Sequence, residues 1–322
     1  MSESLAYSMM RVFVNWQRER RLNKVRERKQ AARMANGLLA AGGDYFAVDG
    51  HSLAIRVDGS IACWGSNDDG RAPPAGVPGN FVAIAAGGGH SLALRVDGSI
   101  ACWGNNDQGK APPDGVPGNF VAIAGGVLHS LALRVDGSIA CWGYNGNGQA
   151  PPAGVPGNFV AIAAGARHSL ALRVDGSVAC WGYNGSGQAP PAGVPGDFVA
   201  ITAGGDHSLA LRVDGSIACW GNNFDGQAPP AGVPGNFVAI AAGVRHSLAI
   251  RVDGSIACWG SNGDSQAPPA GVPGNFVAIA AGFAHSLALR VDGSIACWGR
   301  NGHGQAPPAG VSGPFSVTQA NL

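Results

Sequence analysis

Apolar and polar residues alternate along this chain in a unit of 39 residues, and one clean copy runs over 80–118. Its first apolar segment, 81–86, is hydrophobic throughout, which is typical of a strand buried on both faces. Its second places Leu92, Leu94 and Val96 on one face with a period of two, the pattern of a half-buried strand. The pattern therefore predicts two neighbouring strands at the start of each unit.

The remainder of the unit supplies a third strand and the turns. Residues 99–103 form a further short strand pattern, and Asp97-Gly98 before them predicts a two-residue type I′ hairpin turn, which needs positive φ. Glycines 87–89 provide the turn between the first two strands. Three prolines within 104–118 exclude a central strand there, so we expect an extended connector to the next unit.

The unit is repeated seven times without insertion or deletion, and two columns of residues mark the register. The histidine column is His51, His90, His129, His168, His207, His246 and His285, and the tryptophan column is Trp64, Trp103, Trp142, Trp181, Trp220, Trp259 and Trp298. A three-stranded meander cannot bury both faces alone, whereas seven copies arranged radially can. We therefore predict an all-β, seven-bladed β-propeller of three-stranded blades. The rival, a solenoid, is disfavoured because neither end has a polar capping repeat.

The two ends of the chain suggest how the ring closes. Phe315 lies 39 residues after Phe276, so residues 314–319 resemble a first strand that has no second strand after it. At the other end, the segment 44–48 is a shortened, off-register first strand. We expect the C-terminal strand to complete the first blade, with Tyr45 to Val48 as the alternative.

Charge divides the chain into two parts, which we predict to be a basic amphipathic helical extension at 1–42 and the propeller at 43–322. The extension holds nine Lys and Arg against three acidic residues, and its helix covers about 4–36. Its candidate contacts with an anionic partner, a nucleic acid or a membrane surface, are Arg18, Arg20, Arg21, Arg26 and Arg28. A solvated extension, or residues ahead of a true start such as Met34, is the alternative.

The repeat resembles that of the family named for the regulator of chromosome condensation. The residues that carry the resemblance are Ile84-Ala-Ala-Gly-x-x-His90-Ser-Leu-Ala-Leu94, Asp97-Gly-Ser-Ile and Trp103-Gly-x-Asn106-x-x-Gly109. It implies a seven-bladed propeller, and the short unit is similar to the bacterial branch that includes a proteinaceous β-lactamase inhibitor. Gln149-Ala-Pro-Pro departs from the Gln-Leu-Gly of the eukaryotic pattern and changes only the connector.

No residue set in the sequence predicts catalysis, a metal site or a cofactor site. Equivalent histidines around a ring do not converge on one ion, so we interpret the histidine column as fixing its own hairpin through local backbone hydrogen bonds. One cysteine per unit, without CxxC pairs, indicates a small buried residue in a reducing compartment. There is no secretory signal pattern and no apolar run long enough to span a membrane, so we expect a cytoplasmic protein.

Binding is the function that the varying positions favour. Residues vary just before each column histidine and just after each column tryptophan, and strand direction places both sets at one end of the disc. The candidate contacts to a protein partner are Val127, Leu128, Tyr144, Arg167, Tyr183, Phe224, Arg245, Phe283 and Arg300. We predict a monomeric, non-enzymatic protein-binding scaffold. Neutral drift at exposed turns is the alternative interpretation of this variation.

Two other functions follow from the resemblance and the charge. Guanine-nucleotide exchange for a small GTPase needs a projecting loop, for which the constant 39-residue spacing leaves no room. Chromatin or nucleic-acid association through the basic N-terminal tail is the other. β-Lactamase inhibition is disfavoured, because the varying positions offer only Tyr144, Tyr183, Phe224 and Phe283 as aromatic anchors.

Overall fold

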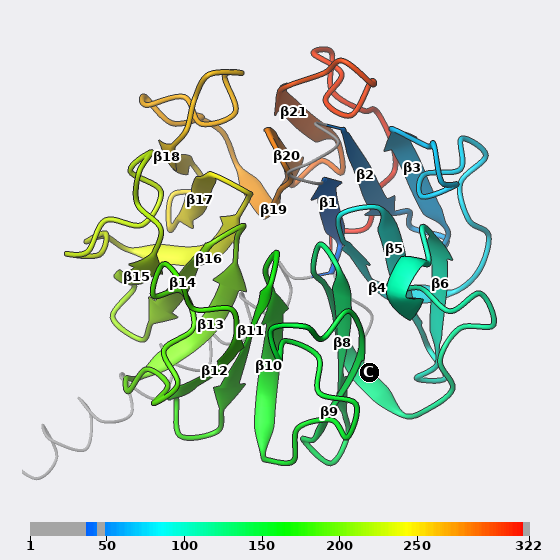
Figure 1. The fold of residues 1–322 in the computed structure, drawn as a ribbon. Helices are drawn as coiled ribbons and strands as arrows, with labels where there is room; N and C mark the ends of the chain where they lie inside the picture. Colours follow the sequence, from blue (N-terminus) through cyan, green and yellow to red (C-terminus); the bar gives the residue numbers. More distant parts are fainter. Residues whose placement is uncertain (1–36, 44–48, 318–322) are drawn as a thin grey trace, which may run out of the picture.

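The computed structural model describes residues 37–43 and 49–317. Over these residues the strands β1–β21 form seven three-stranded antiparallel sheets, which stand as blades around a central axis (Figure 1). The predicted all-β propeller of seven three-stranded blades is confirmed. The predicted helix over 4–36 and the segment 44–48 lie outside the described residues.

Each blade runs in chain order from an inner strand through a middle strand to an outer strand. The inner strands are β1 (Leu39–Gly43), β4 (Phe81–Ala86), β7 (Phe120–Gly125), β10 (Phe159–Ala164), β13 (Phe198–Ala203), β16 (Phe237–Ala242) and β19 (Phe276–Ala281). The middle strands are β2 (Gly50–Ile55), β5 (His90–Arg95), β8 (His129–Arg134), β11 (His168–Arg173), β14 (His207–Arg212), β17 (His246–Arg251) and β20 (His285–Arg290). The outer strands are β3 (Ile61–Gly65), β6 (Ile100–Gly104), β9 (Ile139–Gly143), β12 (Val178–Gly182), β15 (Ile217–Gly221), β18 (Ile256–Gly260) and β21 (Ile295–Gly299).

The hairpin between middle and outer strands has a different turn from the one predicted. Arg95 and Ser99 are joined by a backbone hydrogen bond, and the amide of Gly98 donates to the carbonyl of Arg95 at 3.0 Å. Gly98 has φ +81°, whereas Asp97 is not among the described residues with positive φ. The loop therefore has three residues, a type I turn closed by a left-handed glycine, and the predicted type I′ turn is wrong. The Asp97 carboxylate fixes this turn by accepting from the amide and hydroxyl of Ser99 at 2.9 and 2.6 Å.

The connector after each outer strand adds one residue to the edge of the blade. Val77, Val116 and their equivalents pair with the first residue of the outer strand, and Ile61 and Val77 exchange two backbone hydrogen bonds of 2.9 Å. The prolines leave no room for a longer pairing. The connector is therefore extended, as predicted, and covers one residue of the outer edge.

The hydrophobic core lies between blades. Leu92, Leu94 and Ile100 of the second blade are fully buried and form one cluster with Phe120 of the third, against which Trp142 packs. The same relation recurs around the ring, so each column tryptophan fills the wedge toward the preceding blade. No blade can bury its apolar surface without its neighbours.

A polar chain links the blades inside this core. In every blade the column histidine lies 2.8–3.0 Å through Nε2 from a serine hydroxyl of the following blade. That hydroxyl donates to a connector carbonyl, which also accepts from the indole Nε1 of the column tryptophan; Ser91 and Trp103 both donate to Arg71 O. Since the serine uses its hydrogen on the carbonyl, the histidine must donate from Nε2.

The histidines therefore do not act as the sequence interpretation proposed. Their hydrogen bonds join successive blades and do not fix a local hairpin. The glycine that precedes each histidine loop makes room for the ring: a Cβ at Gly87 would meet the imidazole of His90 and the carbonyl oxygen of Gly126. The motif Gly-x-x-His-Ser therefore supplies the residues that make the contact between blades.

The first blade closes the ring with both ends of the chain. β1 supplies most of its inner strand, and its residue Leu39 pairs with Ala54. The C-terminal segment adds Phe315, which bridges to Arg56 as Phe81 does to Arg95 in the second blade. Phe315 is 4% exposed, so it contributes the apolar residue that begins every other inner strand.

The junction of the two segments falls where the other six inner strands have a bulge. Phe81 and Ala83 pair with successive residues, so Val82 is extra. In the first blade Ser316 and Leu38 both hydrogen-bond to Ile55, at 3.0 and 3.1 Å. The expectation that the C-terminal strand completes this blade is therefore confirmed only for the segment at Phe315, because β1 supplies most of the inner strand. The predicted boundary after residue 42 cuts through β1. The alternative segment, Tyr45 to Val48, lies outside the described residues.

Candidate functional site

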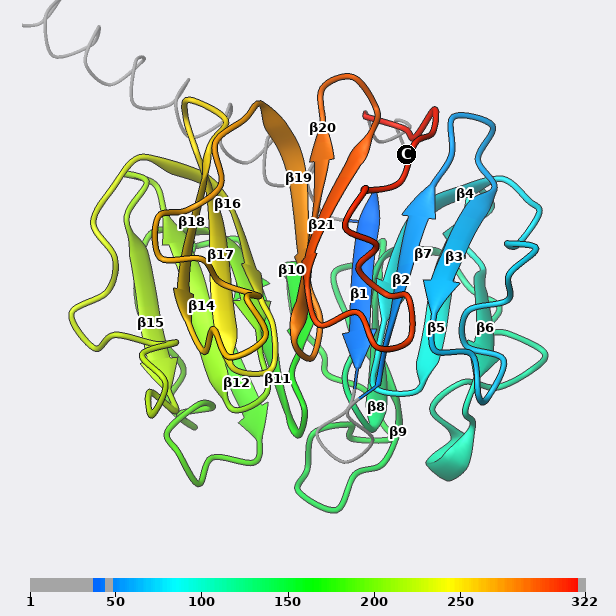
Figure 2. The same cartoon turned by 90° about the horizontal axis from the view of Figure 1, so that it is seen from above.

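The varying loops lie together at one end of the disc, which we call the varied face: the turns between inner and middle strands and the loops after the outer strands. In each of six blades a backbone hydrogen bond ties the two loops, as from Tyr144 N to Leu128 O at 2.9 Å and from Tyr183 N to Arg167 O at 2.8 Å. The opposite end carries the Arg-Val-Asp-Gly-Ser turns and is called the hairpin face. Figure 2 shows the two ends as the lower and upper edges of the disc. The predicted grouping of the two variable sets is confirmed.

The fourth and fifth blades hold an ordered polar cluster on the varied face. The guanidinium of Arg167 lies 4.2 Å from the centre of the Tyr183 ring, a cation–π geometry. The same guanidinium reaches Asp206 of the next blade at 3.8 Å, and Gln188 donates to that carboxylate at 3.0 Å. Arg167 is 42% exposed at its side chain, so the cluster presents a planar cation to solvent.

Tyr144 and Tyr183 occupy equivalent positions in adjacent blades and lie across their own loops. Each phenol oxygen is directly over a glycine, Gly146 or Gly185, where a Cβ would collide with it. Both side chains are half-buried. The two rings are therefore held in place before any partner arrives, which lowers the entropy that binding costs.

The remaining candidates differ in how much surface they offer. Phe224 is 95% exposed, and Arg245 is exposed as well. Leu128, Phe283 and Arg300 are half-buried, and Arg300 lies 4.0 Å from Asp264. Val127 is 8% exposed and lines the central cavity, so its place among the predicted partner contacts is corrected: its side chain has almost no surface to give.

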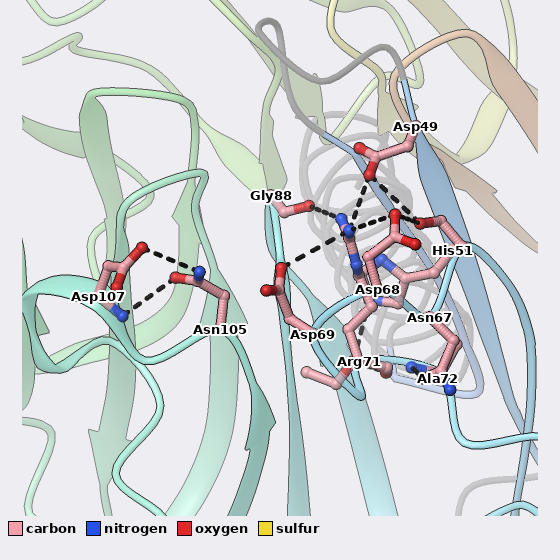
Figure 3. Close-up of polar contacts among 12 residues, drawn as sticks. Asp49, His51, Asn67, Asp68, Asp69, Arg71, Ala72, Gly88, Asn105 and Asp107 are labelled. Atoms are coloured by element: carbon pink, nitrogen blue, oxygen red, sulfur yellow. Dashed lines mark hydrogen bonds and ion pairs between the residues drawn. The ribbon is translucent and has the colours of Figure 1, made fainter.

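A buried ion pair at the junction of the first two blades was missed by the sequence analysis (Figure 3). Arg71, 4% exposed, donates to Asp49 at 2.7 Å and lies 3.5 and 3.7 Å from Asp68 and Asp69. It also reaches the carbonyl of Gly88 in the second blade at 3.4 Å. The available signal was that five units have glutamine at the position of Arg71. In those units the glutamine oxygen accepts from a loop amide, which arginine cannot do.

The column histidines are too buried to serve as ligands or as bases for a bound molecule. All seven have no exposed surface, and burial lowers the pKa of His90, His129, His168, His207 and His246 to about 3 and that of His285 to about 4. For His51 burial, followed by the charge of Arg71, lowers the pKa well below its usual value. Their Nδ1 atoms have no hydrogen-bond partner. They are neutral structural groups at physiological pH.

The cysteines have the surroundings of small core residues. All seven are free thiols and buried, and desolvation raises the pKa of each to about 12. Such thiols are poor nucleophiles, because the thiolate is the reactive form. The reducing compartment inferred from them stays a prediction.

Within residues 37–43 and 49–317, no group of three His, Cys, Asp or Glu side chains is placed to hold a metal ion. The central cavity has a volume of about 90 Å³ and is lined almost wholly by alanine and glycine of the inner strands and of the turns that follow them. Its glycine carbonyls accept hydrogen bonds from the neighbouring blade, as Gly126 O does from Gly88 N at 3.2 Å. This lining offers no side chain for chemistry.

The predicted anionic-surface residues Arg18, Arg20, Arg21, Arg26 and Arg28 lie outside the described residues. Association with a nucleic acid or an anionic membrane surface therefore stays a prediction from the charge of the sequence. Among the residues that the structure describes, no helix has the length and apolar character needed to cross a membrane.

A model of the regulator of chromosome condensation (RCC1) repeat matches six units, at residues 81–110, 120–149, 159–188, 198–227, 237–266 and 276–305. This chain belongs to the RCC1 repeat family. The first unit is not matched, although it keeps the same strands and the same histidine and tryptophan. The resemblance deduced from the repeat is thus confirmed.

The chain is similar in fold to solved structures that include plant and yeast proteins. The ectodomain of the Arabidopsis thaliana receptor kinase ACR4 is 24% identical, with a TM-score of 0.67 over 84% of this chain and 98% of that one. The ectodomain of the Physcomitrella patens receptor kinase CR4 is 26% identical, with a TM-score of 0.65 over 81% and 72%. Prp20p from Saccharomyces cerevisiae is 24% identical, with a TM-score of 0.62 over 75% and 77%. No curated protein sequence matches the chain significantly.

Proposed function

We propose that this RCC1-repeat propeller is a non-enzymatic scaffold that binds a protein partner through its varied face. The observation that carries the proposal is the contrast between the two ends of one rigid ring. One end repeats the same turn seven times, while the other presents Phe224, Arg245 and the Arg167–Tyr183 pair on loops tied to the strands. Aromatic and arginine side chains are enriched in protein interfaces.

Physical properties of these loops support binding. Phe224 exposes 95% of its surface at the tip of its loop, and burying a phenylalanine gains roughly 1.5–3 kcal/mol. Tyr144 and Tyr183 are already ordered over their glycines, so a partner would not need to immobilise them. A complementary partner would offer an apolar pocket for Phe224 and carboxylates for the arginines.

The yeast relative gives a precedent for binding by such a propeller. Prp20p has a crystal structure described together with its binding to Gsp1p and histones, and it has also been crystallised with Kap60. These partners are properties of that protein. For this chain we propose only protein binding in general. The loop residues that would select a partner belong to this chain, so the partners of Prp20p do not identify its partner.

Affinity capture with the full chain tests the proposal. Three baits would be compared: the wild type, the triple variant Tyr144→Ala/Phe224→Ala/Arg245→Ala, and the control Asp136→Lys/Asp175→Lys on the hairpin face. Each would be incubated with an extract of the cells in which the protein naturally occurs. We expect a protein that is held by wild type and by the control and is lost with the triple variant. Capture of the same proteins by all three baits, or loss only with the control, would contradict the proposal.

A further inference from the structure

The hairpin face carries a ring of exposed apolar side chains at its tips. The valine that begins each Val-Asp-Gly turn is 60–71% exposed in six blades: Val57, Val96, Val135, Val174, Val252 and Val291. The equivalent Val213 is partly buried. The second position of a type I turn accepts most residues, so the turn itself does not require valine. The six exposed valines repeat one apolar side chain at the same place on six tips of this face.

Opposite charges flank every valine on this face. In the second blade Arg95 precedes Val96 and Asp97 follows it. The Arg95 guanidinium is held 5.9 Å from the Phe81 ring centre and donates to Ser99 at 3.2 Å. The hydrogen bonds from Ser99 lower the pKa of the Asp97 carboxyl, which keeps it ionised. Each tip thus holds one fixed cation beside one fixed anion, and the ring is complementary in charge to itself.

A groove beside one tip provides a place for an apolar knob. This groove, of about 640 Å³, runs between a connector and the outer strand of the next blade and is lined by Pro229, Pro234, Phe237 and Trp259, with Val252 among the tip residues that line it. A smaller groove of about 280 Å³ lies one blade further on, beside Pro268, Arg290 and Trp298, and its lining does not include the tip valine of that blade. The hairpin face therefore has projecting valines and, at Val252, a tip that borders an apolar groove.

We propose that the hairpin face pairs with the hairpin face of a second copy of this chain, in place of the monomer expected from the sequence. In this arrangement the tip valines of one disc enter the grooves between blades of the other, and the arginine of each tip lies opposite an aspartate of its partner. A two-fold axis in the plane of the contact makes the same patch serve both copies, as in an isologous dimer. A strongly basic or acidic partner would gain little electrostatic binding energy on this face, because the charges of each tip cancel.

Sedimentation velocity of the full chain over about 1 to about 100 µM tests this pairing. The test variant is Val96→Ser/Val135→Ser/Val174→Ser, and the matched control is Phe224→Ser on the varied face. We expect wild type and the control to form dimers with the same dissociation constant. The triple variant should dissociate at least tenfold more readily, which equals about 1.4 kcal/mol. Its thermal midpoint should stay close to that of wild type, because exposed turn changes cost little.

Three results would overturn the proposal. A wild-type chain that stays monomeric across the whole range excludes the pairing and leaves the face to another occupant. A dimer that persists in the folded valine variant uses another surface. A dimer lost through Phe224→Ser uses the varied face.

Discussion

His285 of the last blade donates from Nε2 to the hydroxyl of Ser52 in the first blade, at 3.0 Å. These residues are separated by most of the chain, yet they make the same contact as His90 and Ser130 in adjacent units. The polar chain between blades is therefore continuous around the ring. It runs through the buried core and joins the last blade to the first, beside the C-terminal segment that brings Phe315 into the first blade.

Breaking this contact should destabilise the whole disc. Ser52→Ala leaves the buried Nε2 donor of His285 without an acceptor, which costs roughly 1–3 kcal/mol. His285→Ala removes a buried ring as well and should cost more. A double-mutant cycle measured by urea unfolding should give a coupling of about 0.5–3 kcal/mol. His303→Ala, on an exposed loop, is the control and should change stability by less than about 0.5 kcal/mol. Additive effects of the two mutations would contradict a direct bond.

Acid should unfold the protein steeply. The folded pKa of the column histidines is lowered, to about 3 for His90, so the unfolded chain binds protons that the folded chain cannot. The contribution of each histidine to the free energy of unfolding is therefore fully present above the unfolded pKa of about 6.5. It is lost as the pH falls from there toward the folded pKa of about 3. Each histidine contributes a slope of about 1.4 kcal/mol per pH unit. Urea unfolding at pH 7, 6 and 5 measures this, and a flat profile would mean that the histidines titrate in the folded state.

The two ends of the chain should contribute separately to closure. Phe315→Ala empties a buried position and should cost about 3–5 kcal/mol, although β1 remains in place. Deletion of residues 312–322 should cost at least as much, because it also removes the bridge to Arg56. Thermal melting checks both, with Phe224→Ala as the control for loss of an exposed phenylalanine. An unchanged midpoint after the deletion would show that β1 closes the ring alone.

The Asp49–Arg71 pair gives a prediction that depends on context. Arg71→Gln restores the residue of five other units but leaves Asp49 buried without its cation, which should cost about 3–5 kcal/mol. Adding Asp49→Gly, the residue found at that position in the second and fifth units, should recover most of the loss. Urea unfolding of the two variants decides this. A double variant no more stable than Arg71→Gln would show that the cost does not come from the unpaired carboxylate.

Much of the fold was predictable because every repeat carries the same constraints. The period of 39 and the apolar segments determine the number of blades and their strands. Trp103 is so large that its side chain fits only in the wedge-shaped space between two blades. The sequence could not reveal the partner of His90, because Ser130 comes close only when two blades pack. Val96 was misassigned to the buried face for a related reason: alternation continues through it, but β5 ends at Arg95 and the turn exposes Val96.

Departures from the repeat were harder to predict. β1 has the sequence LAAGG and lacks the Phe-Val pair that begins the other inner strands. In the first blade Phe315, from the C-terminal segment, takes the place of that phenylalanine. Strand patterns do not identify a strand divided between the two chain ends. The Asp49–Arg71 pair joins residues 22 positions apart and follows no period. On the varied face, the sequence identified Phe224 as exposed surface but could not separate it from Val127, which packs into the cavity wall.

The most direct test of the varied face is the dissociation constant of the full chain with a purified partner from the capture experiment, measured by titration calorimetry. Phe224→Ala, Arg245→Ala and Tyr183→Ala should each leave the thermal midpoint nearly unchanged, and at least one should weaken binding by more than about 1 kcal/mol. Asp136→Lys/Asp175→Lys on the hairpin face should leave the constant as in wild type. Binding that responds to the aspartate variant and to none of the three alanine variants would contradict the assignment of the binding face.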